Sequence, residues 1–427
     1  MLNELKQKTA DYVERHKEET IALGDELFNN PELGFHEFKT GRIIEKYLEE
    51  HGLKIDKRFA YTGFSVTIGS GSPHIGIMAE LDAIPTRGHP CADPESTAAH
   101  ACGHSTQCTA MLAALDAINQ HIDELKGTVT LYFTPAEEFT DLPYRQQLVK
   151  EGKIRYLSGK ENMIVDHVFD DVDCIIHIHA MGDPFYHFSV GSTLAGFVYK
   201  KITFIGKAAH AAMMPHLGVN ALNECALFLN AVAYLRETFR DEDMVRIHGI
   251  IDEGGNTVNS IPDKVVYECY VRTANYSILQ TLNRQVTEAA RHCAAAIEGS
   301  CIVEDIPGYF PLIQDETLNK TIEENILDYA DPSIIKHNET SVAAGDVGDI
   351  CLFKPIVQYG YNGISGRIHG ADMRIADPYE VYITQAKIIT GCVLDLLQEP
   401  ERVAEIKKNF QVKMTLEDYI KYLNSEE

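Results

Sequence analysis

Four short runs of the chain combine side chains that bind metal ions with carboxylates that can accept a proton. They are the runs 101–104 (Ala-Cys-Gly-His), 135–138 (Pro-Ala-Glu-Glu), 177–179 (His-Ile-His) and 366–370 (Gly-Arg-Ile-His-Gly). Thiolate, imidazole and carboxylate groups hold divalent ions in proteins. Hydrolysis at such an ion also needs a free carboxylate that takes a proton from water. Together the four runs predict a metal-dependent hydrolase.

Cys102 and His104 are separated by one glycine, just before a predicted helix over Thr106–Asn119. A tight turn of this kind can bring a thiolate and an imidazole to one ion, and a nearby helix N-terminus stabilises the thiolate. Two other interpretations stay open at this point. The cysteine could be a buried core residue beside an incidental histidine, or it could be a nucleophile with His104 as its base.

Glu137 and Glu138 follow the predicted strand Gly127–Phe133 through Pro135. Neighbouring residues of an extended chain point in opposite directions, so both carboxylates reach one site only if the backbone turns, which Pro135 favours. One carboxylate could then bind a metal ion while the other acts as a general base. A solvated acidic pair is the alternative interpretation.

Two further imidazoles extend the candidate ligand set. His177 and His179 come at the end of the predicted strand Asp173–Ile178 and share one face of it. His179 lies nearer the strand end and is the better candidate for a metal ligand, whereas His177 is expected to pack in the core. His369 lies in a glycine-flanked turn that permits close backbone approach to a site, although a lone loop histidine is often only a surface residue.

Asp82 follows the predicted strand His74–Ala79 and could hold a ligating imidazole in place. Glu80 could do so instead, or could bind the metal directly. A capping or turn aspartate is the alternative for Asp82.

The strands that precede these runs alternate with helical segments, which predicts an α/β fold with a mostly parallel sheet flanked by helices. Ligand sites of such sheets lie beyond the carboxyl ends of the strands, where the candidate ligands occur. From residue 193 the order changes to β-α-β-β-α-β, which is ferredoxin-like. The predicted organisation is therefore a catalytic domain in two parts, 1–192 and 307–427, with an inserted α+β domain over 193–306 and a helical C-terminal tail.

The composition narrows the class of protein and of partner. A net charge of −25 over 427 residues excludes nucleic acid and anionic membranes as favoured partners, because both need a basic surface. No apolar run is long enough to span a bilayer, and the start lacks the apolar core of a signal peptide. The ten scattered cysteines are typical of buried thiols in a reducing compartment, so a cytoplasmic protein is expected.

The four runs, in this order, resemble the metal-dependent aminoacylase and carboxypeptidase family. They most resemble its amidohydrolase branch, which includes hippurate, indole-acetyl-amino-acid and aminobenzoyl-glutamate hydrolases. Further segments that carry the resemblance are 30–35 (Asn-Pro-Glu-Leu-Gly-Phe), 80–85 (Glu-Leu-Asp-Ala-Ile-Pro), 206–212 (Gly-Lys-Ala-Ala-His-Ala-Ala), 259–263 (Asn-Ser-Ile-Pro-Asp) and 346–349 (Asp-Val-Gly-Asp).

The resemblance implies a zinc-peptidase-like α/β domain interrupted by a lid domain that usually dimerises, so a homodimer or higher homo-oligomer is expected. It implies one or two divalent ions. The cysteine and histidine ligand types favour zinc, although manganese, cobalt or nickel could occupy the site. Cys102 resembles the ligand that bridges two metals. The remaining ligands implied by the resemblance are His104, Glu138, His179 and His369.

The resemblance also implies the catalytic and substrate-binding residues. Glu137 resembles the general base and Asp82 the aspartate behind the metal site. His210 is similar to a lid histidine that reaches a neighbouring subunit's site and steadies the oxyanion. Asn259 and Arg272 fall where the family holds a carboxylate of its small-molecule substrate. The implied reaction is hydrolysis of an N-acyl or aryl-amide amino acid, or of a short peptide, by metal-activated water.

The chain departs from the branch at two positions. The branch often continues Cys-Gly-His with Asp or Asn and then a second histidine, where this chain has Ser105 and Gln107. Both changes alter the surroundings of the ligands and put metal affinity in doubt. The alternative is a weakened or inactive relative that binds a metabolite or builds an oligomer.

Overall fold

The computed structural model describes residues 2–425, so the end residues 1 and 426–427 of the predicted catalytic domain lie outside the description. The chain divides into two compact units. The first comprises Met1–Ser192, Ile313–Glu339 and Asp349–Met414, and the second comprises Thr193–Leu312, Thr340–Gly348 and Thr415–Glu427. The second unit thus contains the segment 193–306, together with short segments from later in the chain.

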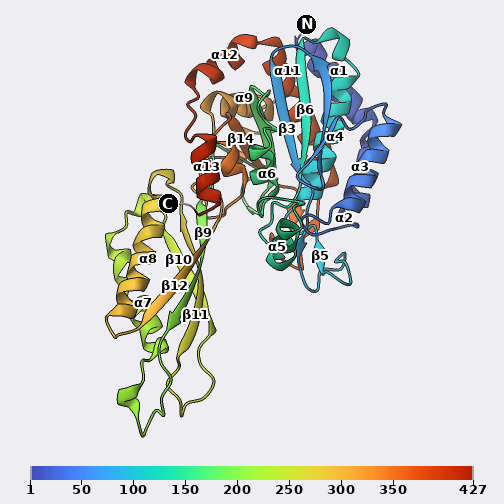
Figure 1. Ribbon diagram of the computed structural model, residues 1–427. Helices are drawn as coiled ribbons and strands as arrows, with labels where there is room; N and C mark the ends of the chain where they lie inside the picture. The colour runs from blue at the N-terminus through green and yellow to red at the C-terminus, as the bar shows by residue number, and fades with distance from the viewer. Residues whose placement is uncertain (1, 426–427) are drawn as a thin grey trace. The chain divides into compact units, whose positions relative to one another are not determined.

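An eight-stranded sheet forms the centre of the first unit, in the order β1-β2-β6-β3-β7-β14-β8-β13 (Figure 1). Its strands are β1 (Lys57–Phe59), β2 (Gly63–Ser70), β3 (His74–Glu80), β6 (Gly127–Thr134), β7 (Cys174–Ala180), β8 (Phe188–Val190), β13 (Ile335–His337) and β14 (Ile356–Tyr361). The pairs β6–β3, β3–β7, β7–β14 and β8–β13 are parallel, and β1–β2, β2–β6 and β14–β8 are antiparallel. The predicted mostly parallel sheet is confirmed.

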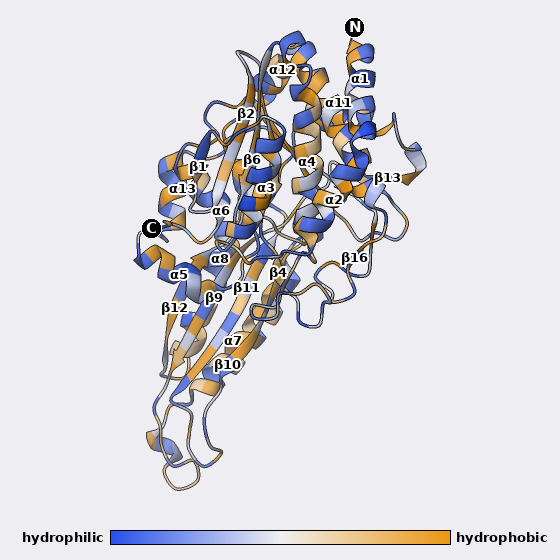
Figure 2. Ribbon diagram, turned by 90° about the vertical axis from the view of Figure 1, so that its right-hand side faces the viewer, coloured by the Kyte–Doolittle hydropathy of each residue, from blue (hydrophilic) through white to orange (hydrophobic). Residues whose placement is uncertain are grey.

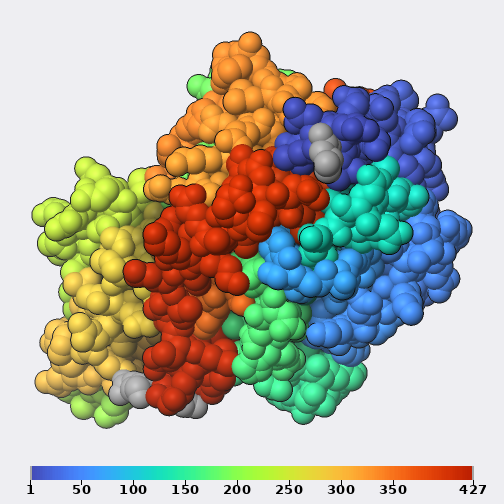
Figure 3. Space-filling view, turned by 90° about the horizontal axis from the view of Figure 1, so that it is seen from above, coloured from blue at the N-terminus to red at the C-terminus, as the bar shows by residue number. Residues whose placement is uncertain are grey.

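Helices flank this sheet. They are α1 (Leu2–Arg15), α2 (Lys17–Phe28), α3 (Phe38–Glu50), α4 (His104–Asn119), α5 (Leu142–Lys150), α6 (Gly159–Val165), α9 (Glu316–Ile326), α11 (Gln385–Gln398) and α12 (Pro400–Asn409). A π-helical turn, Tyr379–Thr384, leads into α11, and α10 (Val347–Ile350) is a short helix. The hydrophilic and hydrophobic residues mixed along α1 and α3 fit helices with one face in water (Figure 2). The C-terminal residues lie on the surface, in red in Figure 3.

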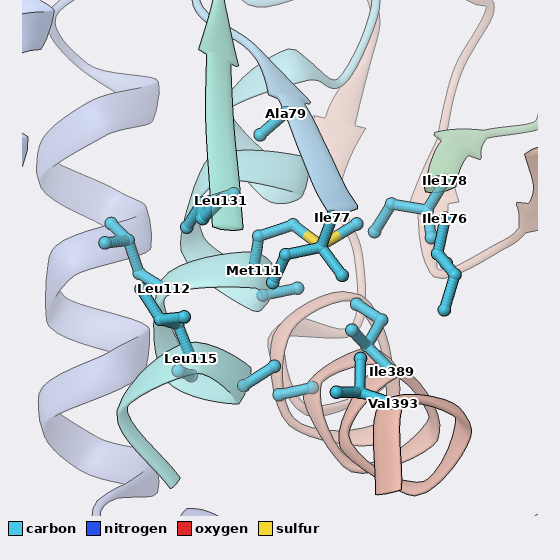
Figure 4. Close-up of a cluster of buried hydrophobic side chains, with 14 of the residues drawn as sticks. Ile77, Ala79, Met111, Leu112, Leu115, Leu131, Ile176, Ile178, Ile389 and Val393 are labelled. Carbon is cyan, nitrogen blue, oxygen red and sulfur yellow. The ribbon is translucent and has the colours of Figure 1, made fainter. Parts of the chain in front are cut away.

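The core of the first unit lies between the sheet and two helices. Ile77 of β3 and Leu131 of β6 pack beside Met111 of α4, while Ile389 and Val393 of α11 close the cluster (Figure 4). All five side chains are fully buried. Because side chains alternate across a strand, this packing fixes which face of each strand is apolar and which residue emerges at its end. The two-stranded sheets β4 (Ile84–Pro85) with β5 (Ala98–Ala99), and β15 (Ile364–Ser365) with β16 (Arg374–Ile375), belong to loops of this unit.

The second unit has the predicted β-α-β-β-α-β order. Its elements are β9 (Gly196–Ile205), α7 (Ala221–Leu235), β10 (Arg246–Glu253), β11 (Lys264–Thr273), α8 (Leu279–Ala295) and β12 (Ser300–Pro307), followed by the C-terminal α13 (Leu416–Leu423). The four strands form an antiparallel sheet in the order β10-β11-β9-β12. The helices α7 and α8 cover one face of it (Figure 1). This is the ferredoxin-like arrangement that the sequence predicts.

The helical periodicity of the N-terminal segment does not correspond to one helix. The periodic stretch 3–29 predicts one helix, but the chain forms α1 and α2, which are separated at His16. The backbone of His16 has φ −100° and ψ 12°, outside the helical region. No helix among residues 2–425 combines the length and the apolar character that crossing a membrane needs. All ten cysteines are free thiols and seven of them are buried.

Candidate metal centre

Five predicted ligands of the first unit converge on one place. Cys102, His104 and His179 form one set of donor atoms, and Cys102, Glu138 and His369 form a second. Within each set the donor atoms lie within 4.8 Å of one another. The two sets share the Cys102 sulfur, and either set could hold a divalent ion.

The distances around the shared sulfur are short. Cys102 Sγ lies 3.5 Å from His179 Nε2 and 3.3 Å from His369 Nε2. The same His369 nitrogen lies 3.2 Å from Glu138 Oε1. Ligands about 2 Å from a common ion are separated by about these distances. The His369 loop is fixed to the cysteine loop by a backbone bond from His369 N–H to the carbonyl of Ala101, 2.8 Å long.

Asp82 orients the imidazole of His104. His104 Nδ1 lies 2.9 Å from the carbonyl oxygen of Asp82 and 3.3 Å from Asp82 Oδ1. These contacts turn His104 Nε2 toward the donor cluster, where it lies 3.8 Å from Glu137 Oε2. Asp82 Oδ2 also accepts a hydrogen bond from the N–H of Glu138, 3.0 Å long. One aspartate therefore fixes residues from both donor sets, which is the position expected for it.

Gly103 lets Cys102 and His104 face the same point. Its φ is 92°, in the left-handed region that favours glycine. A Cβ atom at Gly103 would lie 2.7 Å from the Cβ of Ala180, closer than side chains pack. The tight turn expected from the Cys-Gly-His run thus depends on both the conformation and the size of the glycine.

The turn that carries Glu137 and Glu138 is built differently from the prediction. Pro135 was expected to make it, but the residue in the left-handed region is Ala136, with φ 53°. Glu137 and Glu138 are both mostly buried, at 7% and 8% exposure, and neither is a solvated surface acid. The turn brings Glu138 into the second donor set and Glu137 beside His104, so two adjacent carboxylates do reach one site.

A buried network beside the Nε2 atom of His104 includes a residue that sequence reasoning missed. Lys160 Nζ lies 2.7 Å from Glu80 Oε1, and Gln107 Nε2 donates to Glu80 Oε2 at 2.9 Å. Glu80 Oε2 in turn lies 3.1 Å from His104 Nε2. His177, as expected, packs here in the core, with its Nε2 3.4 Å from Glu80 Oε1. The run Ser-Gly-Lys-Glu at 158–161 signals a helix start, but nothing local in it shows that the lysine turns inward.

The network sets the charges around His104. Burial alone would raise the pKa of Glu80, but Lys160, His177 and His104 outweigh it and hold that pKa well below its ordinary value. Burial also disfavours a charged His104, yet the negative charge of the Glu80 carboxylate raises its pKa well above the usual value. Glu80 is therefore an ionised carboxylate inside the protein, with donors on both of its oxygens.

The Cys102 thiol and the His179 imidazole both favour their uncharged forms. Burial, and then the negative charge of Glu138, hold the pKa of Cys102 well above its ordinary value. The thiol therefore ionises only against an opposing positive charge. Burial lowers the pKa of His179 to about 4, so its imidazole is neutral at pH 7.

The donor atoms fit divalent metal ions. His104 Nε2 and Glu138 Oε1 are buried and take part in no hydrogen bond, although polar atoms lie close to both. Buried polar atoms are rarely left in this state without a ligand or water. Thiolate, three imidazoles and carboxylates form a donor set suited to zinc and its neighbours.

Two of the remaining candidates lie side by side in the second unit. His210 pairs with Ser260 in a backbone bridge, and the carbonyl of Asn259 accepts a 3.0 Å hydrogen bond from the N–H of Ala211. His210 Nδ1 accepts from the N–H of Met213 at 3.1 Å, which orients the ring. Both His210 and Asn259 are exposed.

Arg272 lies at the other end of the same sheet. His210 and Asn259 belong to loops beside the start of β11, whereas Arg272 is eight residues along that strand, about 26 Å at roughly 3.3 Å per residue. Its guanidinium carbon lies 5.3 and 4.8 Å from the ring centres of Phe197 and Tyr270, and its Nε is buried without a hydrogen-bond partner. One copy of this unit therefore does not bring Asn259 and Arg272 to one carboxylate.

Comparison with known proteins gives the family. The chain is 28% identical over 318 residues to N-acetyl-L-cysteine deacetylase of Bacillus subtilis, covering 72% of each chain. It is 30% identical over 290 residues to IAA-amino acid hydrolase ILR1-like 2 of Arabidopsis thaliana, covering 65% of this chain and 62% of that protein. A solved dinuclear metal binding peptidase of Bacillus subtilis shares the fold, with TM-score 0.68, 21% identity and coverage of 90% and 99%. Residues 76–395 match Peptidase family M20/M25/M40, and the chain belongs to this family.

Proposed function

We propose that the chain is a metal-dependent amidohydrolase that cleaves the amide bond of N-acyl or aryl-amide amino acids or of short peptides. The observation that carries the proposal is the pair of donor sets sharing Cys102, with the Glu137 carboxylate beside them. Two relatives support the class of bond, since their names describe the deacetylation of N-acetyl-L-cysteine and the hydrolysis of an amino acid conjugate.

One or two divalent ions belong to this proposal, and the solved Bacillus subtilis relative is itself named a dinuclear metal binding peptidase. When bound, such ions polarise the amide carbonyl and lower the pKa of water toward about 7. Cys102, His104 and His179 would hold one ion, and Cys102, Glu138 and His369 the other. The soft thiolate and the imidazoles favour zinc, and manganese, cobalt or nickel also suit them.

The chain's own residues then have distinct tasks. Glu137 accepts the proton of the attacking water and returns it to the leaving nitrogen. Asp82 keeps His104 in the required orientation. His210 donates to the carbonyl oxygen as negative charge develops there. Arg272 and Asn259 bind the free carboxylate of the substrate.

The spacing within the second unit supports a homo-oligomer. The loops of Asn259 and His210 lie beside the start of β11, whereas Arg272 is eight residues along this strand, about 26 Å at roughly 3.3 Å per residue. Two copies of the chain could supply these residues to one substrate, as the resemblance to lid-dimerised enzymes implies. A fully active monomer would contradict this part of the proposal.

The substitution Glu137→Gln tests the assignment of the base. It should lower kcat by roughly 10²- to 10⁴-fold, because Gln cannot take up a proton, while metal content and unfolding temperature stay unchanged. The assay is release of free amino acid from a panel of N-acyl amino acids and dipeptides with zinc or manganese added. Glu138→Gln is the matched control, since it should lose metal as well as activity.

Three results would count against the proposal. Near wild-type turnover by Glu137→Gln would show that another group is the base. Inactivation by a thiol-alkylating reagent at saturating metal, without any effect of a chelator, would favour the Cys102 nucleophile. Purified wild-type chain without stoichiometric metal would favour a non-catalytic relative.

A further inference from the structure

The conformation of the turn after β6 determines whether Glu137 and Glu138 reach the donor sets. The contacts that fix this turn are therefore important for the site. Ala136 has φ 53°, and this left-handed conformation is unfavourable for an L-residue. Such a conformation persists only where surrounding contacts fix it. Two buried side chains contact the backbone of Ala136. Glu37, far away in the chain, contacts its N–H, and Arg145 of the nearby α5 contacts its carbonyl.

Glu37 holds the N–H side of this peptide. The N–H of Ala136 donates to Glu37 Oε1 at 2.8 Å, and the hydroxyl of Thr62 donates to Glu37 Oε2 at 2.6 Å. The Glu37 side chain is 1% exposed. Both of its oxygens are therefore engaged, and the Ala136 N–H is one of their two partners.

Arg145 holds the carbonyl side. Its Nη1 donates to the carbonyl of Ala136 at 3.3 Å and to that of Leu157 at 2.7 Å, and its Nη2 donates to the carbonyl of Glu138. Arg145 is fully buried, and no carboxylate of the described residues 2–425 forms an ion pair with it. Burial of an arginine with neutral partners alone is costly. A contribution to stability therefore does not explain why an arginine is buried here, whereas control of the turn does.

The surrounding residues fit Arg145 closely. A Cβ atom at Gly34 would lie 2.4 Å from Arg145 Nη2 and 2.8 Å from the Cα of Ala136. The guanidinium carbon also lies 5.5 Å from the centre of the buried Phe35 ring. The Gly34–Phe35 pair, far away in sequence, thus leaves space for one guanidinium against the turn and little for its movement.

We propose that Arg145, assisted by Glu37, positions Glu138 as a metal ligand and Glu137 as the proton acceptor by clamping the Ala136 peptide in its left-handed form. Both are positioning residues, because their contacts run through the backbone of the turn. The inference rests on the proposed function. It adds that metal binding by the donor set containing Glu138 depends on a side chain from α5.

Metal binding by the full-length chain tests the clamp. Equilibrium dialysis against zinc, with metal analysis, should find two ions per wild-type chain. Arg145→Met should keep the ion of the set with His104 and His179, and should bind the other roughly 10- to 100-fold more weakly. Its kcat should fall with little change in KM, because substrate contacts are untouched. Arg145→Lys, which retains one charged donor group, should fall between the two.

Two controls separate positioning from loss of fold. Lys6→Met removes a different partly buried cation of the same unit, which forms a 2.7 Å ion pair with the buried Asp395, and should lower stability without changing metal binding. Glu37→Gln keeps an acceptor for the Ala136 N–H and should keep both ions, whereas Glu37→Leu should weaken the second. If Arg145→Met does not fold, the two Glu37 variants and Arg145→Lys still test the clamp.

The outcomes are distinct for the clamp and for the proposed function. Two ions bound with wild-type affinity by Arg145→Lys and Glu37→Leu would overturn the clamp, as would equal loss of the second ion in Lys6→Met. A wild-type chain that binds no metal would instead refute the proposed function.

Discussion

Removal of the Lys160 ammonium should destabilise the first unit strongly, because it leaves the Glu80 carboxylate buried without its counter-ion. The two side chains are 0% and 2% exposed and 2.7 Å apart. Loss of one partner from such a pair costs about 3–5 kcal/mol, whereas an exposed pair contributes about 0–1 kcal/mol. Gln107 and the imidazole of His177 still face Glu80. We therefore expect a loss near the lower end, about 3 kcal/mol, for Lys160→Met.

The experiment follows urea unfolding of the chelator-treated chain by far-UV circular dichroism, since the chain has no tryptophan. The double variant Lys160→Met, Glu80→Gln has no orphaned charge, so its loss should be smaller than the sum of the two single losses by about 2 kcal/mol. Lys407→Met is the matched control. Lys407 pairs with Asp173 at the surface of the same unit, at 58% exposure, and its loss should cost under about 1 kcal/mol.

Two results would refute this reasoning. One is a Lys160→Met chain within about 0.5 kcal/mol of the wild type, which is the ordinary effect of a surface substitution. The other is strict additivity in the double variant, because it would show that Lys160 and Glu80 do not depend on each other. Either result would mean that the charge of Glu80 is compensated from elsewhere.

Gly103→Ala should abolish binding of both ions, because the new Cβ would meet Ala180 at 2.7 Å and displace Cys102. Gly52→Ala, at φ 70° with no atom within 4 Å, carries only the conformational cost of about 1 kcal/mol and should bind metal normally in the same dialysis assay. Burial raises the pKa of Glu224 to about 7, so the folded second unit keeps a proton that the unfolded chain releases near pH 4.5. Its stability should therefore fall as pH rises from about 4.5 to 7. Glu224→Gln should flatten this fall in unfolding temperature, and an unchanged slope would contradict the assignment.

The positions of the candidate ligands follow from local sequence patterns. His179 and His177 differ only by their place on β7, and strand parity with distance from the strand end predicted which one faces the donor cluster. The Cys-Gly-His turn is equally predictable from the sequence, because it needs only a glycine of positive φ between two metal-binding side chains. In both cases the decisive residues are close together in the chain.

The residues that support the site could not be predicted in this way. Lys160 and Arg145 are cations in helices of mixed composition, and only tertiary packing turns them inward. Glu37 lies about a hundred residues from the turn that it holds. The fixed φ of Pro135 favours a turn at that residue, but Ala136 takes the unusual conformation because buried partners of its N–H and of its carbonyl hold it there.

The hydrogen-bond partners of Ser105 and Gln107 indicate whether the site has lost its function. A position that has lost its role leaves buried polar atoms without partners, and the Ser105 hydroxyl is in that state. Gln107 is not, because it donates to Glu80 Oε2 and accepts from the N–H of Glu80 at 3.0 Å. Burying the Glu80–Lys160 pair costs more desolvation free energy than burying apolar residues of similar volume. A chain that no longer needed His104 for metal binding would therefore gain stability by replacing this pair with apolar residues. The network around Gln107 is thus better explained by a working metal centre than by a relic of one.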